Sequence, residues 1–408
     1  MNVTILTTIF PRFKDDYRGA FLGRMATALS EAGDLNIQVI TPSSTDNLLS
    51  EKWDKLSIVR FQYWLPQKNQ TLAYGKEDTF SNIRRSFWNI FQVPAYLCAF
   101  FAKVISNWRQ TDIFHCQWTF TAIFPILINK ILPFFRKPII IACRGSDLRL
   151  MPGWLNRFFL RNVKAITYGS PLETINRYQE KVGVDILKYI RENTPHGAFC
   201  VFDPLDENNL IPTIADLKTR LGYDGKKVIL FLGRLDEFKD PIYALRILKE
   251  LIRRRTDTIL LIVGFGPLEN EVKNFIKDHA LEEFVIFVGP RSDVANYFHM
   301  ADIFVATSPY EHVWSSTIAE AMMVGCPLVL TDVGNTSKVF THDFDAMLVP
   351  LNQPNHTAIQ LNSLLDNPEK LGSLVLNAKK TLNKYRRYEK QTVEDYCNLY
   401  EKVLESAS

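Results

Sequence analysis

The sequence predicts an α/β protein with two doubly wound parallel sheets, one after the other. Short apolar strands alternate with helical stretches along the chain, which is the pattern of parallel strands joined by crossover helices. A length of 408 residues exceeds what one ordinary core holds, and favours two domains of about 200 residues. Apolar residues make up 47% and charged residues 23% of the chain, as in a globular protein in water.

The expected strands fall into two sets, separated near residue 205. The first set is Val3–Thr8, Ile37–Thr41, Ser57–Gln62, Ile113–Cys116, Ile139–Ala142 and Ala165–Tyr168. The second set is Val228–Leu232, Ile259–Val263, Val285–Val288, Ile303–Ala306, Leu328–Thr331 and Ala346–Val349. We therefore expect an N-terminal domain over residues 1–205, a C-terminal domain over residues 206–385 and a closing helix over residues 386–408. The apolar face of that helix is able to pack on either domain, including back on the first, and its periodicity does not decide between them.

Cysteine usage and the N-terminus indicate a cytoplasmic protein. The six cysteines lie far apart and form no Cys-x-x-Cys pair, which argues against a zinc site or a disulfide framework. The first eight residues read as a strand and lack the basic region of a signal peptide. We therefore expect reduced thiols and no bound metal.

The net charge of +4 is unevenly distributed. Residues 1–200 hold 25 Lys and Arg against 15 Asp and Glu, a balance of +10, and the remainder has a balance of −6. The excess indicates an anionic partner for the first half, such as a membrane surface, a lipid phosphate or an acidic glycan, although solvated basic faces are also common.

Two stretches of the first half, Phe87–Ile105 and Phe120–Phe135, are unusually apolar, and each adjoins a pair of basic residues. Polar or helix-breaking residues interrupt both, in the first stretch Asn89, Gln92 and Pro94, so neither is predicted to span a bilayer. Either both are core-facing helices, or they form a surface that enters an anionic membrane interface and holds the protein at the inner face of the membrane.

Two loops of the second half are suited to phosphate, because ligands of doubly wound sheets bind at the carboxyl ends of the strands. After the first strand come Gly233, Arg234 and Lys239; the glycine admits a close backbone approach, and two cations five residues apart are able to straddle a diphosphate. After the next strand comes Gly264-Phe-Gly266-Pro-Leu, a turn leading into a helix. The first strand of the chain is not followed by GxGxxG, which makes an oxidoreductase the weaker interpretation.

The segment from Ser308 to Gly334 is the most informative. A polar loop leads from a strand into a helix that begins near Ser316 or Thr317. The N-terminus of that helix offers backbone N–H groups and the positive end of a dipole to an anion. Glu320 has two interpretations here: it completes a capping box with Thr317, or it serves a ligand site.

The second half resembles the donor domain of the family 4 retaining glycosyltransferases, whose motifs occur here in the same order over about residues 225–350. The matching pieces are Phe231-Leu-Gly233-Arg234-Leu with Lys239, Val263-Gly-Phe-Gly266-Pro-Leu, Ala301-Asp-Ile-Phe-Val, Ser308-x-x-Glu311, Glu320-Ala-Met-x-x-Gly325-x-Pro327 and Asp332-Val-Gly334. The first half matches more loosely, at Gly19 before a helix, at Asp112-Ile-Phe-His115-Cys-Gln117 and at Arg144-Gly-Ser-Asp147.

The resemblance implies a GT-B fold, in which two Rossmann-like domains face a cleft, and a retaining transfer that needs no metal or other cofactor. The donor would be a UDP- or GDP-sugar and the acceptor a glycan or lipid-linked molecule, with no nucleic acid involved. Arg234 and Lys239 would neutralise the leaving diphosphate, beside Gly233 and Gly266. Ser316 and Thr317 would add backbone donors, and Glu320 would bind the ribose. The first domain would line the cleft with Gly19, His115, Gln117, Arg144 and Asp147.

Departures from the family motifs leave some roles open. The family has seven residues between its two glutamates, but eight separate Glu311 from Glu320, and His312 stands at the family spacing. Either Glu311 or His312 would therefore be the catalytic residue facing the donor sugar, and the register favours His312. In the first half Gln117 and Arg144 replace histidines of the family, and neither side chain is able to shuttle a proton.

Two other functions are compatible with the same motifs. A nucleotide-sugar 2-epimerase of this fold would act on the nucleotide sugar without an acceptor. A catalytically silent subunit would support a partner transferase, but such a subunit need not keep Arg234, Lys239 and Glu320. The nucleotide base, the sugar, the acceptor, the linkage and the oligomeric state are not encoded in any motif that we recognise.

Overall fold

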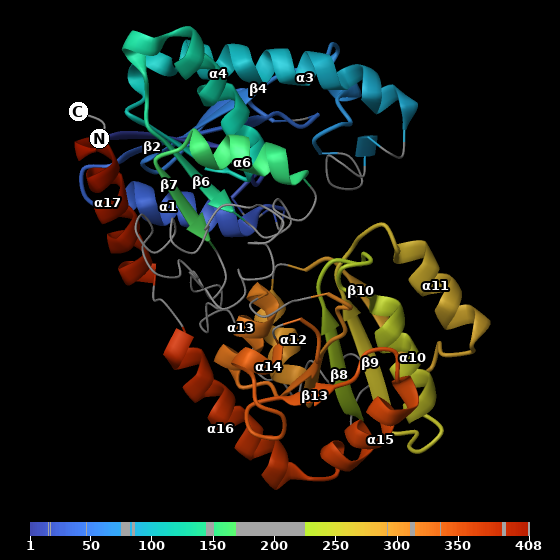
Figure 1. Ribbon diagram of the computed structural model, residues 1–408. Helices are drawn as coiled ribbons and strands as arrows, with labels where there is room; N and C mark the ends of the chain where they lie inside the picture. Colours follow the sequence, from blue (N-terminus) through green and yellow to red (C-terminus); the bar gives the residue numbers. More distant parts are fainter. Residues whose placement is uncertain are drawn as a thin grey trace. The chain divides into compact units, whose positions relative to one another are not determined.

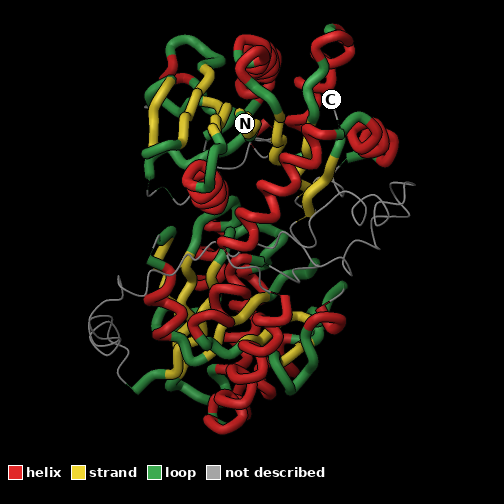
Figure 2. The backbone as a smooth tube through the Cα atoms, turned by 90° about the vertical axis from the view of Figure 1, so that its left-hand side faces the viewer, coloured by secondary structure: helices red, strands yellow, loops and turns green. Residues whose placement is uncertain are grey.

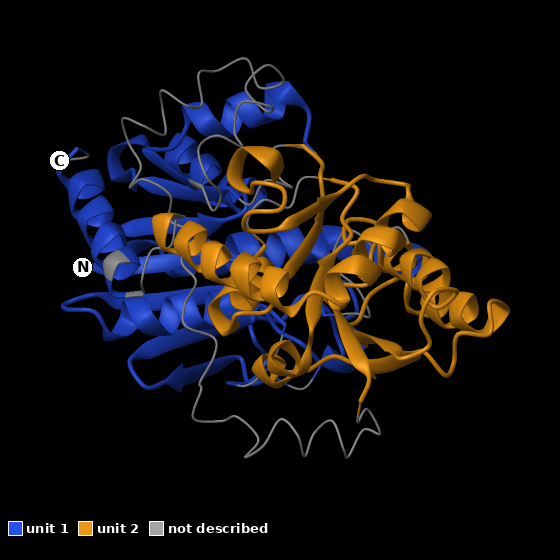
Figure 3. Cartoon of the chain, turned by 90° about the horizontal axis from the view of Figure 1, so that it is seen from below, with its two compact units in different colours: residues 1–202, 387–408 blue, residues 203–386 orange. Residues whose placement is uncertain are grey.

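The computed structural model describes residues 1–14, 16, 18–45, 47–74, 82–83, 86–143, 151–168, 225–291, 293–310, 315–334, 336–385 and 389–406. By their internal contacts, residues 1–202 and 387–408 form unit 1 and residues 203–386 form unit 2 (Figure 3). Each unit has its own sheet and its own hydrophobic core, and helices surround the strands of both (Figure 2). The predicted α/β class with two parallel sheets is confirmed.

Unit 1 is built on a seven-stranded sheet with the order β3-β4-β2-β1-β5-β6-β7. Its strands are β1 Asn2–Leu6, β2 Asn36–Pro42, β3 Ser50–Trp53, β4 Leu56–Phe61, β5 Ile113–Gln117, β6 Ile139–Cys143 and β7 Ala165–Tyr168. Neighbouring strands are parallel except β3 and β4, which form an antiparallel pair at the edge. The edge strand β3 was not among the predicted strands, because its four residues are mostly polar and half of them are exposed.

The helices of unit 1 cover this sheet and include the last helix of the chain. They are α1 Ala20–Glu31, α3 Phe87–Ser106, α4 Ile123–Ile131, α6 Gly153–Arg161 and α17 Glu389–Glu405, with short 3-10 turns η1 Gln67–Asn69, η2 Trp108–Gln110, η3 Thr119–Ala122 and η4 Pro133–Phe135. On α17, Tyr396, Leu399, Tyr400 and Val403 are buried in the same cluster as residues of α1 and β1. The apolar face seen in the sequence therefore packs within unit 1.

Helix α3 differs from the prediction that Asn89, Gln92 and Pro94 interrupt this apolar stretch. It runs for 20 residues without a break, through Pro94. By length and composition it is apolar enough to cross a bilayer, and it is one such helix among the residues that the structure describes. One side of α3 does face the core, through Tyr96, Phe100 and Val104. The opposite side is exposed.

Unit 2 is built on a six-stranded, fully parallel sheet with the order β10-β9-β8-β11-β12-β13. Its strands are β8 Lys227–Leu232, β9 Thr258–Val263, β10 Val285–Gly289, β11 Ile303–Ala306, β12 Leu328–Thr331 and β13 Met347–Val349. Strand β9 is buried at every residue. A parallel strand covered by helices on both faces favours such an unbroken apolar sequence.

The helices of unit 2 lie on both faces of the sheet, with α10 and α11 on one side and α12 and α13 on the other (Figure 1). They are α10 Pro241–Leu251, α11 Glu269–Asp278, α12 Val294–Met300, α13 Ser316–Val324, α14 Thr336–Val339, α15 Pro354–Leu365 and α16 Pro368–Tyr385. Proline opens α10 at its first position, where the missing N–H costs no helical hydrogen bond. Gly325 ends α13 with a left-handed φ of 85°.

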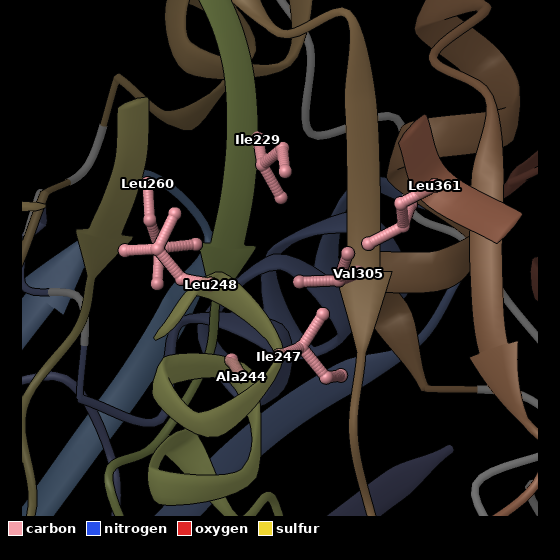
Figure 4. A pocket seen from close by; sticks show the side chains of 7 residues that line it. All are labelled: Ile229, Ala244, Ile247, Leu248, Leu260, Val305 and Leu361. Carbon is pink, nitrogen blue, oxygen red and sulfur yellow. The ribbon is translucent and has the colours of Figure 1, made fainter. Parts of the chain in front are cut away.

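A small cavity lies inside unit 2 between β8, β9, β11, α10 and α15 (Figure 4). Its volume is about 10 Å³, and its lining consists of Ile229, Ala244, Ile247, Leu248, Leu260, Val305 and Leu361. The lining offers no polar side chain to orient a ligand, so this cavity is a packing gap and not a binding site.

Candidate active site

The order of strands in unit 2 places a ligand site between β8 and β11. From β8 the chain proceeds outward to β9 and β10, and it then returns to the other side of β8 with β11. The loops after β8 and β11 therefore leave in opposite directions, and ligands of doubly wound sheets bind at this switch point. Arg234 and Lys239 lie in the first loop, and the second leads to the N-terminus of α13.

The loop after β8 is organised by Asp236. Its side chain is buried and accepts hydrogen bonds from the backbone N–H groups of Phe238 and Lys239, each at 3.1 Å, and from Arg234 Nε at 2.8 Å. The stem of Lys239 passes over Gly233, where an added Cβ would stand 3.7 Å from Lys239 Cγ. One carboxylate thus bonds the Arg234 guanidinium directly and the backbone of the loop at Lys239.

The loop after β11 is hydrogen-bonded to the loop after β8. Thr307 Oγ1 donates to the backbone oxygens of Lys239 at 3.0 Å and Asp240 at 2.8 Å. The rings of Phe238 and Tyr310 lie 5.4 Å apart. Because a side chain of the second loop bonds the backbone of the first, the two sides of the switch point form one structural piece.

The N-terminus of α13 is capped by Ser315, whose Oγ accepts a hydrogen bond from the backbone N–H of Ile318 at 3.3 Å. The predicted capping box between Thr317 and Glu320 is therefore wrong, because the third position after the cap is Ile318. Glu320 lies two residues further along, with only 6% of its surface exposed. The first N–H groups of the helix, at Ser316 and Thr317, have no helical carbonyl to bind and suit an anion.

The glycines of the loop after β9 serve the contact between two loops. A Cβ on Gly266 would lie 2.3 Å from the backbone oxygen of Leu235, and one on Gly264 would lie 1.8 Å from that of Gly233. The backbones are joined there by a hydrogen bond from Leu235 N to Phe265 O at 2.8 Å. Gly266 was predicted from its place in a phosphate loop, and this packing is a further reason for a glycine there.

Desolvation lowers the pKa of the Lys239 ammonium group, and the nearby Asp236 carboxylate opposes that shift. A lysine held in this way is less stable as a cation than one in water. A bound diphosphate would supply the missing negative charge and raise the pKa again. The interaction of Lys239 with an anion is therefore stronger than that of a fully hydrated surface lysine.

In unit 1 the corresponding switch point lies between β1 and β5, and three predicted residues are described there. Gly19 caps α1 with a left-handed φ of 71°, and a Cβ at this position would lie 3.2 Å from Phe10 Cα. His115 and Gln117, on β5, are completely buried. The other two predicted residues of the first domain, Arg144 and Asp147, lie outside the described residues.

His115 is tied to the last helix of the chain. Its Nδ1 lies 2.8 Å from the Tyr400 hydroxyl, and its Nε2 lies 3.2 Å from Gln117 Nε2. An amide nitrogen only donates, so with the Gln117 amide in this orientation Nε2 of the imidazole accepts, and Nδ1 carries the proton that Tyr400 receives. The imidazole at this position joins the end of β5 to α17.

Two further residues belong to these sites and were not singled out from the sequence. Asp236 was passed over because an aspartate in a loop is common, and only its three contacts reveal its role. Trp118 directly follows β5 and has a φ of 67° with a ψ of 143°, a region that is nearly restricted to glycine. Its ring packs edge-on against Phe21, with 6.4 Å between centroids. Strain of this kind collects at functional sites, and no residue pattern would have revealed it.

The predicted catalytic pair Glu311 and His312 lies outside the described residues, so the choice between them stays open. Within the described part of the chain, no group of three or more His, Cys, Asp or Glu side chains is placed to hold a metal ion. Positive charge at the switch point of unit 2 is supplied by Arg234, Lys239 and the N-terminus of α13.

Comparison with known protein families finds a match in the second unit. Residues 215–381 match the family described as glycosyl transferases group 1. The match covers about two fifths of the chain and lies within unit 2. The second-half motifs on which the resemblance rests, from Phe231 to Gly334, all fall inside this match.

Several curated relatives match about a third to a half of the chain. Spore coat protein SA of Bacillus subtilis is 28% identical over 208 residues, 46% of this chain and 52% of the relative. The UDP-Gal:alpha-D-GlcNAc-diphosphoundecaprenol alpha-1,3-galactosyltransferase of Escherichia coli is 30% identical over 128 residues, 31% of this chain and 33% of the relative. The chain spans about half the length, or less, of the curated relatives that match it first.

A solved structure extends the likeness to both units. Anabaena HepE, crystallised in complex with UDP-glucose, superposes with a TM-score of 0.68 over 100% of this chain and 99% of its own, at 15% sequence identity. At that identity the likeness establishes the fold, and the fold is GT-B. The residues that match the group 1 family thus lie in the second of two Rossmann-like units.

Proposed function

We propose that this chain is a retaining glycosyltransferase that moves a sugar from a nucleotide diphosphate to a glycan or lipid-linked acceptor. The observation that carries the proposal is the arrangement of Arg234 and Lys239, held on one loop by Asp236 at the switch point, beside the N-terminus of α13. The names of two similar proteins support the substrate class, since one was crystallised with UDP-glucose and the other acts on a lipid-linked diphosphate.

The chemistry follows from where charge develops. As the bond between the sugar C1 and the diphosphate oxygen breaks, its electron pair goes to the leaving diphosphate. Arg234, Lys239 and the N–H groups at the start of α13 are fixed before the reaction and stabilise this charge more in the transition state than in the substrate. The acceptor hydroxyl attacks C1 from the side on which the diphosphate leaves. Its proton passes to a phosphate oxygen, and the configuration at C1 is retained.

The donor side of the site is expected to need no metal ion, because fixed cations take the place of Mg²⁺. Thermal unfolding should be measured with UDP, GDP and ADP, each in the presence of EDTA. One of them should raise the unfolding temperature, since a ligand at about 100 times its Kd stabilises the folded state by about 2.7 kcal/mol. Arg234→Ala should abolish that rise. If no nucleotide stabilises the protein, or stabilisation requires Mg²⁺ or Mn²⁺, the assignment of the cations is wrong.

Donor binding should weaken at alkaline pH because the pKa of Lys239 is lowered in the free protein. Below that pKa the lysine is already charged, and the affinity is independent of its titration. Above it, binding the diphosphate requires uptake of a proton, so Kd rises by up to about tenfold per pH unit until the pKa of the complex is reached. Calorimetric titration with a nucleotide sugar, whose diphosphate does not titrate in this range, measures both Kd and the proton uptake.

The matched control is Lys239→Arg, because a guanidinium stays charged over the whole range. This variant should bind the nucleotide sugar with no proton uptake and no dependence on alkaline pH. Equal proton uptake by the wild type and Lys239→Arg would assign the titration to another group.

A further inference from the structure

In its first two turns, helix α3 has polar side chains facing inward and aromatic side chains facing outward. Asn89 and Gln92 are buried against the rest of unit 1. Phe87 and Phe91 are 74% and 53% exposed. A helix on the surface of a protein in water has the opposite arrangement, with its apolar stripe toward the core. The exposed stripe of α3 continues through Pro94, Cys98 and Ile105, at spacings of three, four and seven residues that keep them on one side of the helix.

The orientation of α3 is determined by hydrogen bonds of its inward polar groups. Asn89 accepts from Thr71 Oγ1 at 2.6 Å and donates to the backbone oxygen of Asn82 at 2.7 Å. Gln92 accepts from the backbone N–H of Thr71 at 3.2 Å and donates to the backbone oxygen of Asn69 at 3.0 Å. Rotating the helix to bury its phenylalanines would break all four bonds. The aromatic stripe is therefore held outward.

A second apolar element, η4, is equally exposed and equally fixed. Phe134 is 93% and Phe135 is 68% exposed. The backbone around them is held by Trp108 Nε1, which donates to the oxygen of Phe135 at 3.0 Å, and by Asn129, whose side chain makes two 2.8 Å bonds with the backbone of Lys137. Because Trp108 directly follows α3 in the chain, η4 lies beside the C-terminal end of that helix. We call the exposed side of α3 together with η4 the α3–η4 face.

The charge around this face has one sign. Between residues 87 and 139 the chain has five basic residues, Lys103, Arg109, Lys130, Arg136 and Lys137, and one acidic residue, Asp112. The carboxylate of Asp112 accepts a hydrogen bond from the backbone N–H of Asn2 at 2.8 Å, at the start of β1. The phenylalanines of η4 are thus flanked by Lys130, Arg136 and Lys137, with no acidic side chain among them.

We infer that the α3–η4 face docks on the surface of an anionic lipid bilayer. Aromatic and aliphatic side chains would enter the boundary between headgroups and acyl chains, and the flanking cations would meet lipid phosphates. Helix α3 is apolar enough to cross a bilayer. However, Asn89 and Gln92 bond its first two turns to unit 1, and Tyr96, Phe100 and Val104 pack in the core of that unit further along. The helix therefore lies on the membrane and does not cross it. The single sign of the charge favours anionic lipid over a protein partner, whose surface carries both signs.

Binding of the full-length protein to vesicles tests this inference. Co-sedimentation with phosphatidylcholine vesicles should increase as phosphatidylglycerol is added. It should decrease as salt is raised from about 50 mM to about 500 mM, because surface charges are screened within about 8 Å at physiological ionic strength. Arg136→Ser combined with Lys137→Ser should lower the partition coefficient on anionic vesicles by on the order of 30-fold, the product of about fivefold per basic residue.

Phe91→Ser combined with Phe134→Ser tests the apolar part and should lower binding at every salt concentration. The matched control is Leu376→Ser, because Leu376 on α16 of unit 2 is 65% exposed but lies outside the face. All three proteins should unfold at similar temperatures, since the changed side chains make few contacts with the core. Binding by the double variant at the wild-type level would overturn the inference, as would a wild type that ignores anionic vesicles at low salt.

Cys98 provides a second measurement, because its thiol is exposed on the stripe, whereas Cys116, Cys143 and Cys326 are buried. With Cys200→Ser and Cys397→Ser, an environment-sensitive dye attached at Cys98 should shift to shorter wavelength when anionic vesicles are added. An unchanged spectrum in the presence of bound vesicles would place another surface at the membrane.

The oligomeric state tests a second copy of the chain as the occupant of the face. If the wild type ignores vesicles and is a dimer, and the Phe91 and Phe134 double variant is a monomer, the face belongs to a second copy of the chain.

The inference is independent of the transfer reaction. The α3–η4 face belongs to unit 1, whereas Arg234 and Lys239 belong to unit 2. The surface variants should therefore bind nucleotide diphosphate as the wild type does. Loss of vesicle binding with intact nucleotide binding, and the reverse, distinguish a failure of this inference from a failure of the proposed function.

Discussion

Replacing Arg234 or Lys239 with alanine should slow sugar transfer by about 10²- to 10³-fold, which corresponds to about 2.7–4 kcal/mol in the barrier. Each substitution removes a cation from the oxygen atoms on which charge develops. Turnover should be measured both as transfer and as slow hydrolysis of the nucleotide sugar, because hydrolysis needs no acceptor.

Glu237→Ala is the matched control, because Glu237 is exposed in the same loop, between the two cations in sequence. Its activity should stay within a few-fold of the wild type. Near-normal turnover by both Arg234→Ala and Lys239→Ala would refute the proposed site. Conversion of the nucleotide sugar to its 2-epimer, with no acceptor present, would instead establish an epimerase.

Gly264→Ala should destabilise unit 2 by more than about 3 kcal/mol, in the range reached when a core is overpacked or a backbone is strained. The new Cβ would stand 1.8 Å from the carbonyl oxygen of Gly233, and the φ of 147° is one that alanine rarely adopts. The clashing atom belongs to the backbone at the end of strand β8, so no change of side-chain rotamer is able to relieve the clash. Urea unfolding followed by circular dichroism measures the change in free energy.

Gly289→Ala separates the clash from the cost of the backbone angle. Gly289 also has a positive φ, of 81°, but no atom lies within 4 Å of the position that the alanine Cβ would take. We expect the substitution to cost about 1 kcal/mol, the ordinary cost of left-handed backbone in a residue with a side chain. If the two variants unfold at the same urea concentration, the contact between the loops after β8 and β9 is not as tight as the structure has it.

Local sequence was a good guide wherever a strand is buried on both faces. Runs such as Thr258–Val263 have no polar residue facing water, so their composition alone marks them as inner strands of a parallel sheet. The edge strand β3 is polar and half-exposed, so its composition does not distinguish it from a loop. Helix ends were less well determined: Ser315, Ser316 and Thr317 are all suitable caps by residue type, and only the hydrogen bond to Ile318 shows that Ser315 is the one used.

The cations of the site were predictable because their position in the chain, directly after β8, places them at the end of the sheet where ligands bind. The aspartate that bonds this loop was not predictable, since the sequence does not distinguish a buried aspartate from a solvated one. Asp236 is distinguished by its three bonds and its burial. The same holds for Trp118, whose unusual backbone arises from the turn that η3 makes after β5.

The sequence by itself determined the two sheets, the loops that carry Arg234 and Lys239, and the presence of an apolar face on the last helix. Only the tertiary structure decided what that face packs on, that Asn89 and Gln92 face inward and that the aromatic stripe of α3 faces outward. The physical reason is the same in each case. Periodicity specifies that a helix has two different sides, whereas the side that becomes buried depends on the hydrogen-bonding groups and apolar surface that distant parts of the chain bring to it.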